Sequence, residues 1–144
     1  MNKLNIVRNY MIDNDFKMVV MNNDKMVLTS KDRGIKPIYD AYTKNLELLN
    51  GSFVADRVIG KAAAELLIHG NIKGLYTDLI SDIALGVLND HEISVDFKNK
   101  VPYILNREGN DLCPIETISR NSKDINQLIQ GIEEFFIKVG MVNK

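Results

Sequence analysis

The sequence predicts an α/β fold, in which helices cover a mixed five-stranded sheet. Near the N-terminus, the apolar runs KMVVM and KMVLTS flank a polar turn, a pattern typical of an antiparallel hairpin. Later in the chain, short apolar runs alternate with helical patterns, which favours parallel strands. The length of 144 residues and the hydrophobic content of 45% suit one core. We therefore expect a single domain over residues 1–144.

The first third of the chain predicts two helices around the hairpin. Three apolar residues at helical spacing predict a helix over residues 3–13. After the hairpin, Gly34 can reverse the chain and Pro37 favours a helix start. Apolar residues at helical spacing then continue to Leu49, which predicts a second helix in this region.

The next stretch, GSFVADRVIGKAAAELLIHG, predicts a helix from Ser52 to His69. Ser52 can cap its start by accepting a hydrogen bond from a free backbone amide, and Gly70 can end it. Apolar residues recur along one side of this helix. Because Gly60 and the alanines at 62–64 carry little side-chain bulk, we expect the helix to pack closely against a neighbour through this surface.

The remaining segments supply the other strands and helices. GLYTDLI, ISVDF and VPYILN predict three strands, with a helix over SDIALGVLND between the first two. CPIETIS predicts a further helical turn, and DINQLIQGIEEFFIKVG predicts an amphipathic closing helix that stops at Gly140. Together with the two hairpin strands, these three strands make the predicted sheet.

Composition argues against several classes of partner. The formal net charge of −1 and the pI near 6.1 leave no basic excess, so we expect no nucleic-acid binding. No apolar run approaches the roughly 20 residues of a membrane span, so we expect no membrane partner. The single cysteine, Cys113, cannot form an internal disulfide, and the N-terminal residues lack the apolar run of a signal peptide. A cytoplasmic location is therefore the expectation.

Four segments of the chain carry a family resemblance: SKDRGIKPI, GSFVADRVIGKAAAELL, YTDLIS and VPYILNREGNDLCPIE. In this order they resemble a small bacterial and archaeal family of deaminase-like proteins whose function is undefined, and the resemblance covers about residues 15–120. It implies a cytidine deaminase-like fold with three layers, α/β/α, around the mixed sheet with its N-terminal hairpin.

The zinc signature of the deaminases is missing from these segments. Zinc deaminases use a His-x-Glu and a Pro-Cys-x-x-Cys sequence to hold the metal and move protons. In this chain VADRVIG offers only Asp56, and SDIAL places Ser81 and Asp82 where the thiolates are expected. Serine hydroxyls are poor zinc ligands. The resemblance thus implies a deaminase scaffold without zinc, and we expect no metal and no other cofactor.

Asp56 and Lys61 are candidate catalytic residues on the predicted helix. In a first helical turn, the Asp56 carboxylate either only complements the helix dipole, or it binds a ligand amine or acts as a base. Lys61 either joins a solvated row of charges with Arg57 and Glu65, or it faces a pocket among the small residues around it.

Cys113 and Glu116 form a second catalytic candidate. Pro114 suits the first position of a helix, which leaves Cys113 at the cap, where the helix dipole favours the reactive thiolate. Glu116 in the same turn can accept backbone amides or orient the thiol proton. The alternative is an inert, buried cysteine. A nucleophilic cysteine usually needs a histidine partner, and neither His69 nor His91 is expected nearby.

Arg33, Asn106 and Arg107 are candidate ligand-binding residues in turns. Ordinary turn chemistry explains the polar residues around them. Alternatively, the two arginines clamp a phosphate or carboxylate near a helix N-terminus.

Three functions remain open at this point. The first is binding of a small polar or nucleoside-like metabolite near Asp56, Lys61, Ser81 and Asp82, with or without turnover. The second is a non-catalytic regulatory module that self-associates into a homo-oligomer through its helical faces. The third is a thiol-dependent enzyme that uses Cys113.

Overall fold

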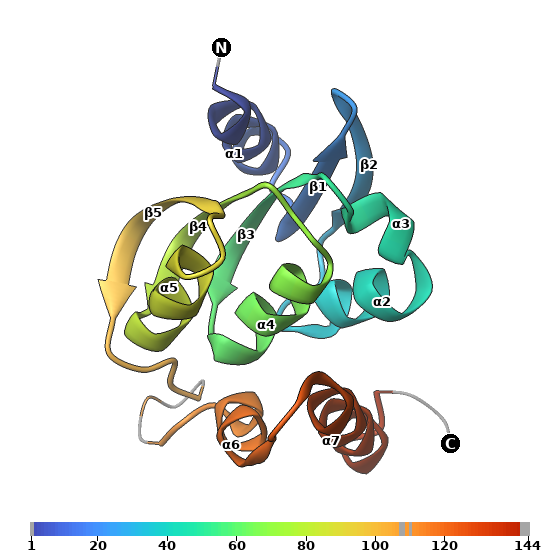
Figure 1. Ribbon diagram of the computed structural model, residues 1–144, viewed down its shortest axis with the longest axis vertical. Coiled ribbons are helices and arrows are strands. Elements are labelled where there is room, and N and C mark those ends of the chain that lie inside the picture. Colours follow the sequence, from blue (N-terminus) through green and yellow to red (C-terminus); the bar gives the residue numbers. More distant parts are fainter. Residues whose placement is uncertain (1, 107–108, 110, 142–144) are drawn as a thin grey trace.

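A five-stranded sheet forms the centre of the computed structural model, which describes residues 2–106, 109 and 111–141 (Figure 1). Its strands are β1 (Met18–Asn22), β2 (Lys25–Ser30), β3 (Phe53–Ile59), β4 (Gly74–Ser81) and β5 (Ser94–Val101). Their order across the sheet is β2-β1-β3-β4-β5. β1 is antiparallel to both β2 and β3, whereas β3, β4 and β5 run parallel. The predicted mixed α/β sheet with an N-terminal hairpin is confirmed.

Helices cover both faces of the sheet. They are α1 (Lys3–Asp13), α2 (Lys36–Lys44), α3 (Leu46–Leu49), α4 (Lys61–His69), α5 (Asp82–Asn89), α6 (Pro114–Asn121) and α7 (Ile125–Lys138). α1 packs on one face, and α2, α4, α5 and α7 contribute to the larger core on the other (Figure 1). None of these helices, within the described part of the chain, has the length and apolar character of a membrane span.

The alternation of side chains along β1 builds both cores. Val19 and Met21 join the core under α1, while Met18 and Val20 join the larger one. This follows from the two-residue period of a strand, whose successive side chains point to opposite faces. A strand that is apolar on both faces therefore occupies an interior position in the sheet.

Local turn chemistry explains the hairpin. Asn23 and Asp24 connect β1 to β2 with φ values of 50° and 63°. A type I′ hairpin turn has positive φ at both positions, and Asn and Asp tolerate it better than most residues. The two hairpin strands, β1 and β2, lie where the sequence predicts them.

The helices outside the centre of the chain also follow the sequence. α1, α5, α6 and α7 lie within or close to the predicted segments. The predicted helix after Pro37 is instead divided into α2 and α3, because Asn45 leaves the helical conformation at φ −137° and ψ 43°.

The prediction of one helix from Ser52 to His69 is wrong. The first half of that stretch is β3, and only the second half is α4. β3 pairs with β1 on one side and with β4 on the other, and its valines and isoleucine suit a strand. Ser52 is buried, and its hydroxyl has no hydrogen-bond partner among the described residues, so it caps no helix. Asp56 consequently lies within a strand, not in a first helical turn.

VPYILN is not a strand of the sheet. β5 already contains Val101 and ends there, and Tyr103 is exposed. Leu105 makes only an isolated bridge to Leu112. The sheet still has five strands because β3, which the sequence pattern misassigned, takes the place of this segment.

Glu116 caps α4 from a distant part of the chain. Gly60, the N-cap residue of α4, has no side chain to satisfy the free amides of the first turn. Glu116 of α6 does so instead, because its Oε1 accepts a hydrogen bond from the Lys61 backbone amide at 3.0 Å. A Cβ atom on Gly60 would collide with this carboxylate and lie 3.3 Å from Ile104. Gly60 is thus closely packed as predicted, but it lies at the start of α4 and faces Glu116 of α6. It is not part of a helix surface.

We expect Gly60→Ala to lower the free energy of unfolding by about 1 to 3 kcal/mol, because the added methyl group displaces the Glu116 carboxylate. Chemical denaturation measures this change. Gly86→Ala is the matched control, since a Cβ there meets nothing within 4 Å, and a helical Gly→Ala change should stabilise α5 by about 0.5 to 1 kcal/mol. Equal effects of the two substitutions would contradict the close contact.

Candidate functional site

A cavity of about 540 Å³ opens at the edge of the sheet where β3 ends. The residues before β1 and after β2 meet the end of β3 there, because β1 is antiparallel to both strands. We call it the charged cavity, and it is lined by Asp15, Lys17, Asp32, Arg33, Gly34, Asp56, Arg57, Val58 and Leu105. Small-molecule sites typically have volumes of about 300 to 1,000 Å³, so this cavity has a suitable size.

Asp56 is the buried acidic group of the charged cavity. Only 6% of the residue is exposed, and one carboxylate oxygen accepts a hydrogen bond from the Val58 amide at 3.1 Å. Burial raises the pKa of Asp56 to about 7, against the smaller opposing effects of the Val58 and Arg57 amides and of the Arg57 charge. A carboxyl group with this pKa can give up or accept a proton near neutral pH.

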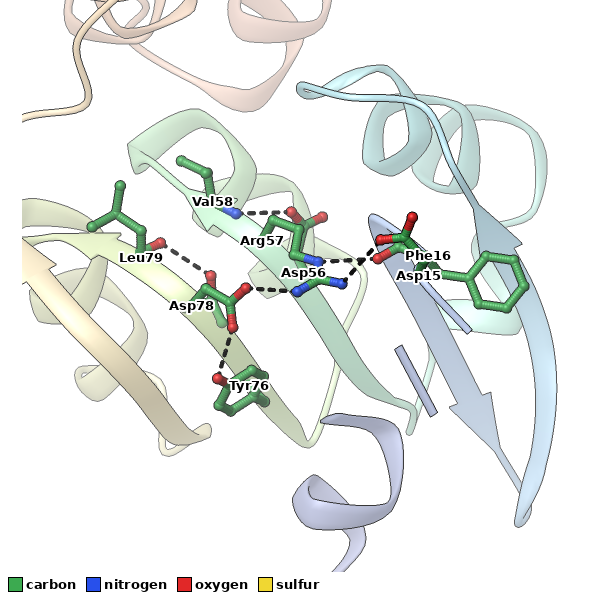
Figure 2. Close-up of polar contacts among 9 residues, drawn as sticks. Asp15, Phe16, Asp56, Arg57, Val58, Tyr76, Asp78 and Leu79 are labelled. Carbon is green, nitrogen blue, oxygen red and sulfur yellow. Dashed lines mark hydrogen bonds and ion pairs between the residues drawn. The ribbon is translucent and has the colours of Figure 1, made fainter. Parts of the chain in front are cut away.

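Arg57, the next residue, belongs to a separate polar network (Figure 2). Its Nε donates to the Phe16 carbonyl at 3.1 Å, and its guanidinium contacts Asp78 at 3.0 Å. The Tyr76 hydroxyl donates to the other oxygen of Asp78 at 2.8 Å, and burial is the main reason why the pKa of Tyr76 is raised to about 12. These contacts hold the Arg57 guanidinium, which also lies 3.9 Å from Asp15. Arg57 is therefore a structural wall of the cavity.

A second, smaller cavity of about 120 Å³ adjoins the first. Both are bounded by Gly34 and Val58. We call it the apolar cavity, and the rest of its lining is Ile35, Ile38, Gly60, Ala62, Ala63, Ile104, Cys113, Ile115 and Glu116.

The structure does not bring Lys61 to Asp56. Lys61 Nζ donates to the Ser119 carbonyl at 3.3 Å and pairs with Glu65 at 3.1 Å, and Lys61 lines neither cavity. Asp56 projects from a strand, whereas Lys61 follows the turn at Gly60 and faces α6. Of the expected charged row, Lys61 and Glu65 form an ion pair. Arg57 does not belong to this row, because it lies in β3.

Ser81 and Asp82 lie at the end of β4 and line neither cavity. Ser81 is buried and caps α5, because its hydroxyl accepts a hydrogen bond from the Ala84 amide at 3.2 Å. Asp82 is exposed and lies 3.6 Å from Lys100. The structure thus separates both residues from Asp56.

Cys113 and Glu116 do lie together, at the apolar cavity. Cys113 is half-buried at the cap position of α6, as predicted, and its side chain makes no capping hydrogen bond. Glu116 is only 4% exposed and is engaged with α4. Neither histidine lines this cavity; His91 contacts the Val87 carbonyl at 2.9 Å, and His69 ends α4.

The predicted turn residues have different positions. Arg33 lines the charged cavity with Asp56. The backbone N–H of Asn106 donates to the Asp111 carbonyl at 2.9 Å, and Asn106 takes part in further interactions. Arg107 lies outside the described residues, so the expected pair of arginines is represented by Arg33 alone.

Sequence analysis missed Asp15, Lys17 and Asp32 as residues of one site. They stand in the segments DNDFK and SKDRG, just before and just after the hairpin. The two ends of a hairpin necessarily lie side by side, as the pairing of Met18 with Ser30 shows. The charged residues on both sides of the predicted hairpin could therefore have indicated one shared site.

Comparison with known proteins identifies the family. Residues 6–136 match the model described as TM1506: Domain of unknown function (DUF1893). The chain belongs to the DUF1893 family. A crystal structure of a DUF1893 family protein (TM1506) from Thermotoga maritima is similar, with 25% sequence identity and a TM-score of 0.80 over 92% of this chain and 89% of that chain. No curated protein matches.

Metal-ligating residues are not gathered in the described part of this DUF1893 protein. Among those residues, no group of three His, Cys, Asp or Glu side chains is placed to hold a metal ion. The charged cavity itself combines acidic residues with Lys17, Arg33 and Arg57. The cavity thus presents both carboxyl groups and cationic side chains.

We expect Asp56→Asn to stabilise the protein increasingly as the pH rises from about 4 to 7. In this range the folded state retains a proton on Asp56 that the unfolded state, with a pKa near 3.8, has lost, so the stability of the parent falls with rising pH. Asparagine removes this penalty, which is on the order of a few kcal/mol at pH 8, and it can still accept the Val58 hydrogen bond. Denaturation at several pH values measures the difference.

Asp82→Asn is the control for this experiment, because it makes the same chemical change on an exposed side chain. Its effect should stay under about 0.5 kcal/mol across the pH range. If Asp56→Asn has the same stability relative to the parent at pH 4 and pH 8, the carboxyl group is not desolvated as described.

We expect Glu116→Ala to destabilise the protein by about 1 to 3 kcal/mol, because it leaves the Lys61 amide without its acceptor. Glu116→Gln keeps an oxygen at this position and should recover most of the loss. Thermal and chemical unfolding of the two variants measure this order. Equal stability of alanine and glutamine variants would argue against the capping role.

Proposed function

We propose that this DUF1893 protein binds a small polar metabolite of about nucleoside size in the charged cavity. The observation that carries the proposal is the Asp56 carboxyl group, which is 6% exposed and lines a cavity of about 540 Å³. Burial of an ionisable group without a close counter-ion costs stability. Residues that reduce stability in this way are concentrated in functional sites.

The surrounding charges support a ligand with more than one polar group. Lys17 and Arg33 line the same cavity, and neither has an ion-pair partner within 4.0 Å in the described ranges. Arginine and lysine side chains in such positions bind carboxylates or phosphates. Asp56 can accept a hydrogen bond from an amine or a ring N–H of the ligand. A nucleoside-like metabolite or another polar metabolite of this size meets these requirements.

Asp56 is also the group of this site best suited to proton transfer. Its pKa of about 7 matches the working range of a general base. Turnover of the ligand would thus depend on Asp56, whereas binding depends on the whole cavity.

We further propose that the fold is related to the cytidine deaminase-like fold without its zinc chemistry. The mixed five-stranded sheet with an N-terminal hairpin and helices on both faces supports this relation. Ser81 and Asp82, which stand where thiolates were expected, are engaged with Ala84 and Lys100. We therefore propose a function that needs no metal cofactor.

The thiol-dependent alternative has less support. Cys113 lines an apolar cavity, and the described lining of that cavity contains no histidine that could accept its proton. Glu116, the nearby acid, already accepts the hydrogen bond of the Lys61 amide.

A thermal-shift screen with a library of polar metabolites, including nucleosides, tests the proposal. A ligand at 100 times its Kd stabilises the folded state by about 2.7 kcal/mol, which gives a measurable rise in Tm. We expect at least one compound to shift the parent and Asp82→Asn, but not Asp56→Asn. Compounds that shift the parent are then assayed for turnover.

Two results would contradict this proposal. A hit that stabilises the parent and Asp56→Asn equally places the binding site elsewhere. No hit at all would favour the self-association alternative, which sedimentation of the parent at increasing concentration measures directly.

A further inference from the structure

The charged and apolar cavities lie side by side along β3. Asp56 lines the first, and Val58 lines both. Two residues apart in a strand, these side chains project from the same face at a spacing of about 7 Å. Arg33 and Gly34 span the same boundary, because Arg33 lines the charged cavity but not the apolar one and Gly34 lines both. One small molecule can therefore reach both cavities.

The unpaired charges of the larger cavity are balanced. Arg57 and Asp15 lie 3.9 Å apart, and Arg57 also binds Asp78. The other charged lining residues are Lys17, Arg33, Asp32 and Asp56, and no ion pair within 4.0 Å engages them in the part of the chain that the structure describes. Two acidic and two basic side chains without ion-pair partners suit a ligand that carries both charges.

The smaller cavity suits an apolar group. Aliphatic side chains and small residues make up most of its lining, including Ile104, Ile115 and Ala63. Its volume is about 120 Å³, and a dry cavity of about 150 Å³ is known to accept benzene. A group between a branched aliphatic chain and a single aromatic ring therefore matches it in size.

We propose that the ligand is a small amphipathic zwitterion of the apolar amino-acid class. Its ammonium group lies at Asp56, its carboxylate faces Arg33 and Lys17, and its side chain enters the apolar cavity past Val58. This inference rests on the proposed function and narrows its ligand class. It also assigns the apolar cavity as a specificity pocket.

L-phenylalanine and three probes that each lack one of its groups test the inference on the full chain. L-phenylalanine carries all three groups, glycine lacks the apolar group, 2-phenylethylamine lacks the carboxylate, and 3-phenylpropionate lacks the amine. Titration calorimetry or NMR measures each Kd. We expect L-phenylalanine to bind at least about tenfold more tightly than each of the others, which corresponds to about 1.4 kcal/mol per missing group.

Cys113 provides a way to fill the apolar cavity. Its side chain lines that cavity and makes no capping hydrogen bond, so Cys113→Phe adds bulk there without removing a polar contact. We expect Cys113→Phe to lose the preference for L-phenylalanine over glycine, and Cys113→Ala to keep it. If Cys113→Phe fails to fold, labelling the Cys113 thiol of the folded parent with a small disulfide reagent fills the same space.

The outcomes separate this inference from the proposed function. Uridine is included as a nucleoside probe. Binding of uridine that depends on Asp56, without binding of L-phenylalanine, overturns the amino-acid class and leaves the proposed function intact. Equal affinities for L-phenylalanine and glycine, or an unchanged preference in Cys113→Phe, overturn the role of the apolar cavity. If 10 mM L-phenylalanine shows no binding, the inference as a whole is overturned. Binding would then be weaker by at least about 2.7 kcal/mol than a Kd of 0.1 mM implies.

Discussion

The hydrogen bond between the Lys61 amide and Glu116 Oε1 connects the C-terminal helices to the sheet. It satisfies the start of α4, a helix whose own cap residue is Gly60. It also fixes the position of α6, and with it the side of the apolar cavity formed by Cys113 and Ile115. Because Glu116 is buried and the bond is partly buried, its loss would leave a poorly solvated polar atom without a partner. Together with the hydrogen bond from Lys61 Nζ to the Ser119 carbonyl, this contact holds the α6 side of the apolar cavity.

The chemistry of the charged cavity depends on the two-residue period of β3. Asp56 and Arg57 are adjacent in sequence but project from opposite faces of the sheet. Arg57 contacts the Phe16 carbonyl and Asp78, whereas Asp56 is buried and accepts a hydrogen bond from the Val58 amide. The contacts described for the chain include no ion pair between the two residues. Burial raises the pKa of Asp56 to about 7, and the nearby Arg57 charge opposes this effect only in part.

Much of the fold could be predicted from the sequence because its signals are local. The hairpin follows from Asn23 and Asp24, and the closing helix from its apolar stripe. β3 could not be predicted in this way, because the apolar residues of a strand and of the helix after it happened to continue one helical period across Gly60. A short apolar run has no period that separates strand from helix. What identifies β3 is its pairing with β1 and β4, which only the folded chain provides.

The candidate site could also be predicted only in part, because contacts between distant segments leave no local pattern in the sequence. The sequence singled out Asp56 and Arg33 and paired Cys113 with Glu116, and the structure places these four residues along two adjoining cavities. It grouped Asp56 wrongly with Lys61, because that grouping assumed a shared helix. Side chains such as Lys17 come to the site only through the antiparallel pairing of β1.

The span of the Lys61–Glu116 contact also has a kinetic consequence. The two residues are 55 positions apart, whereas the hairpin pairs residues that are 3 to 12 positions apart. Closing long loops costs more entropy and slows folding, so local pairings tend to form before distant ones. The β1–β2 hairpin can therefore form before α6 docks on α4. A ligand that fills both cavities would then hold the late-arriving C-terminal helices in place and slow their undocking.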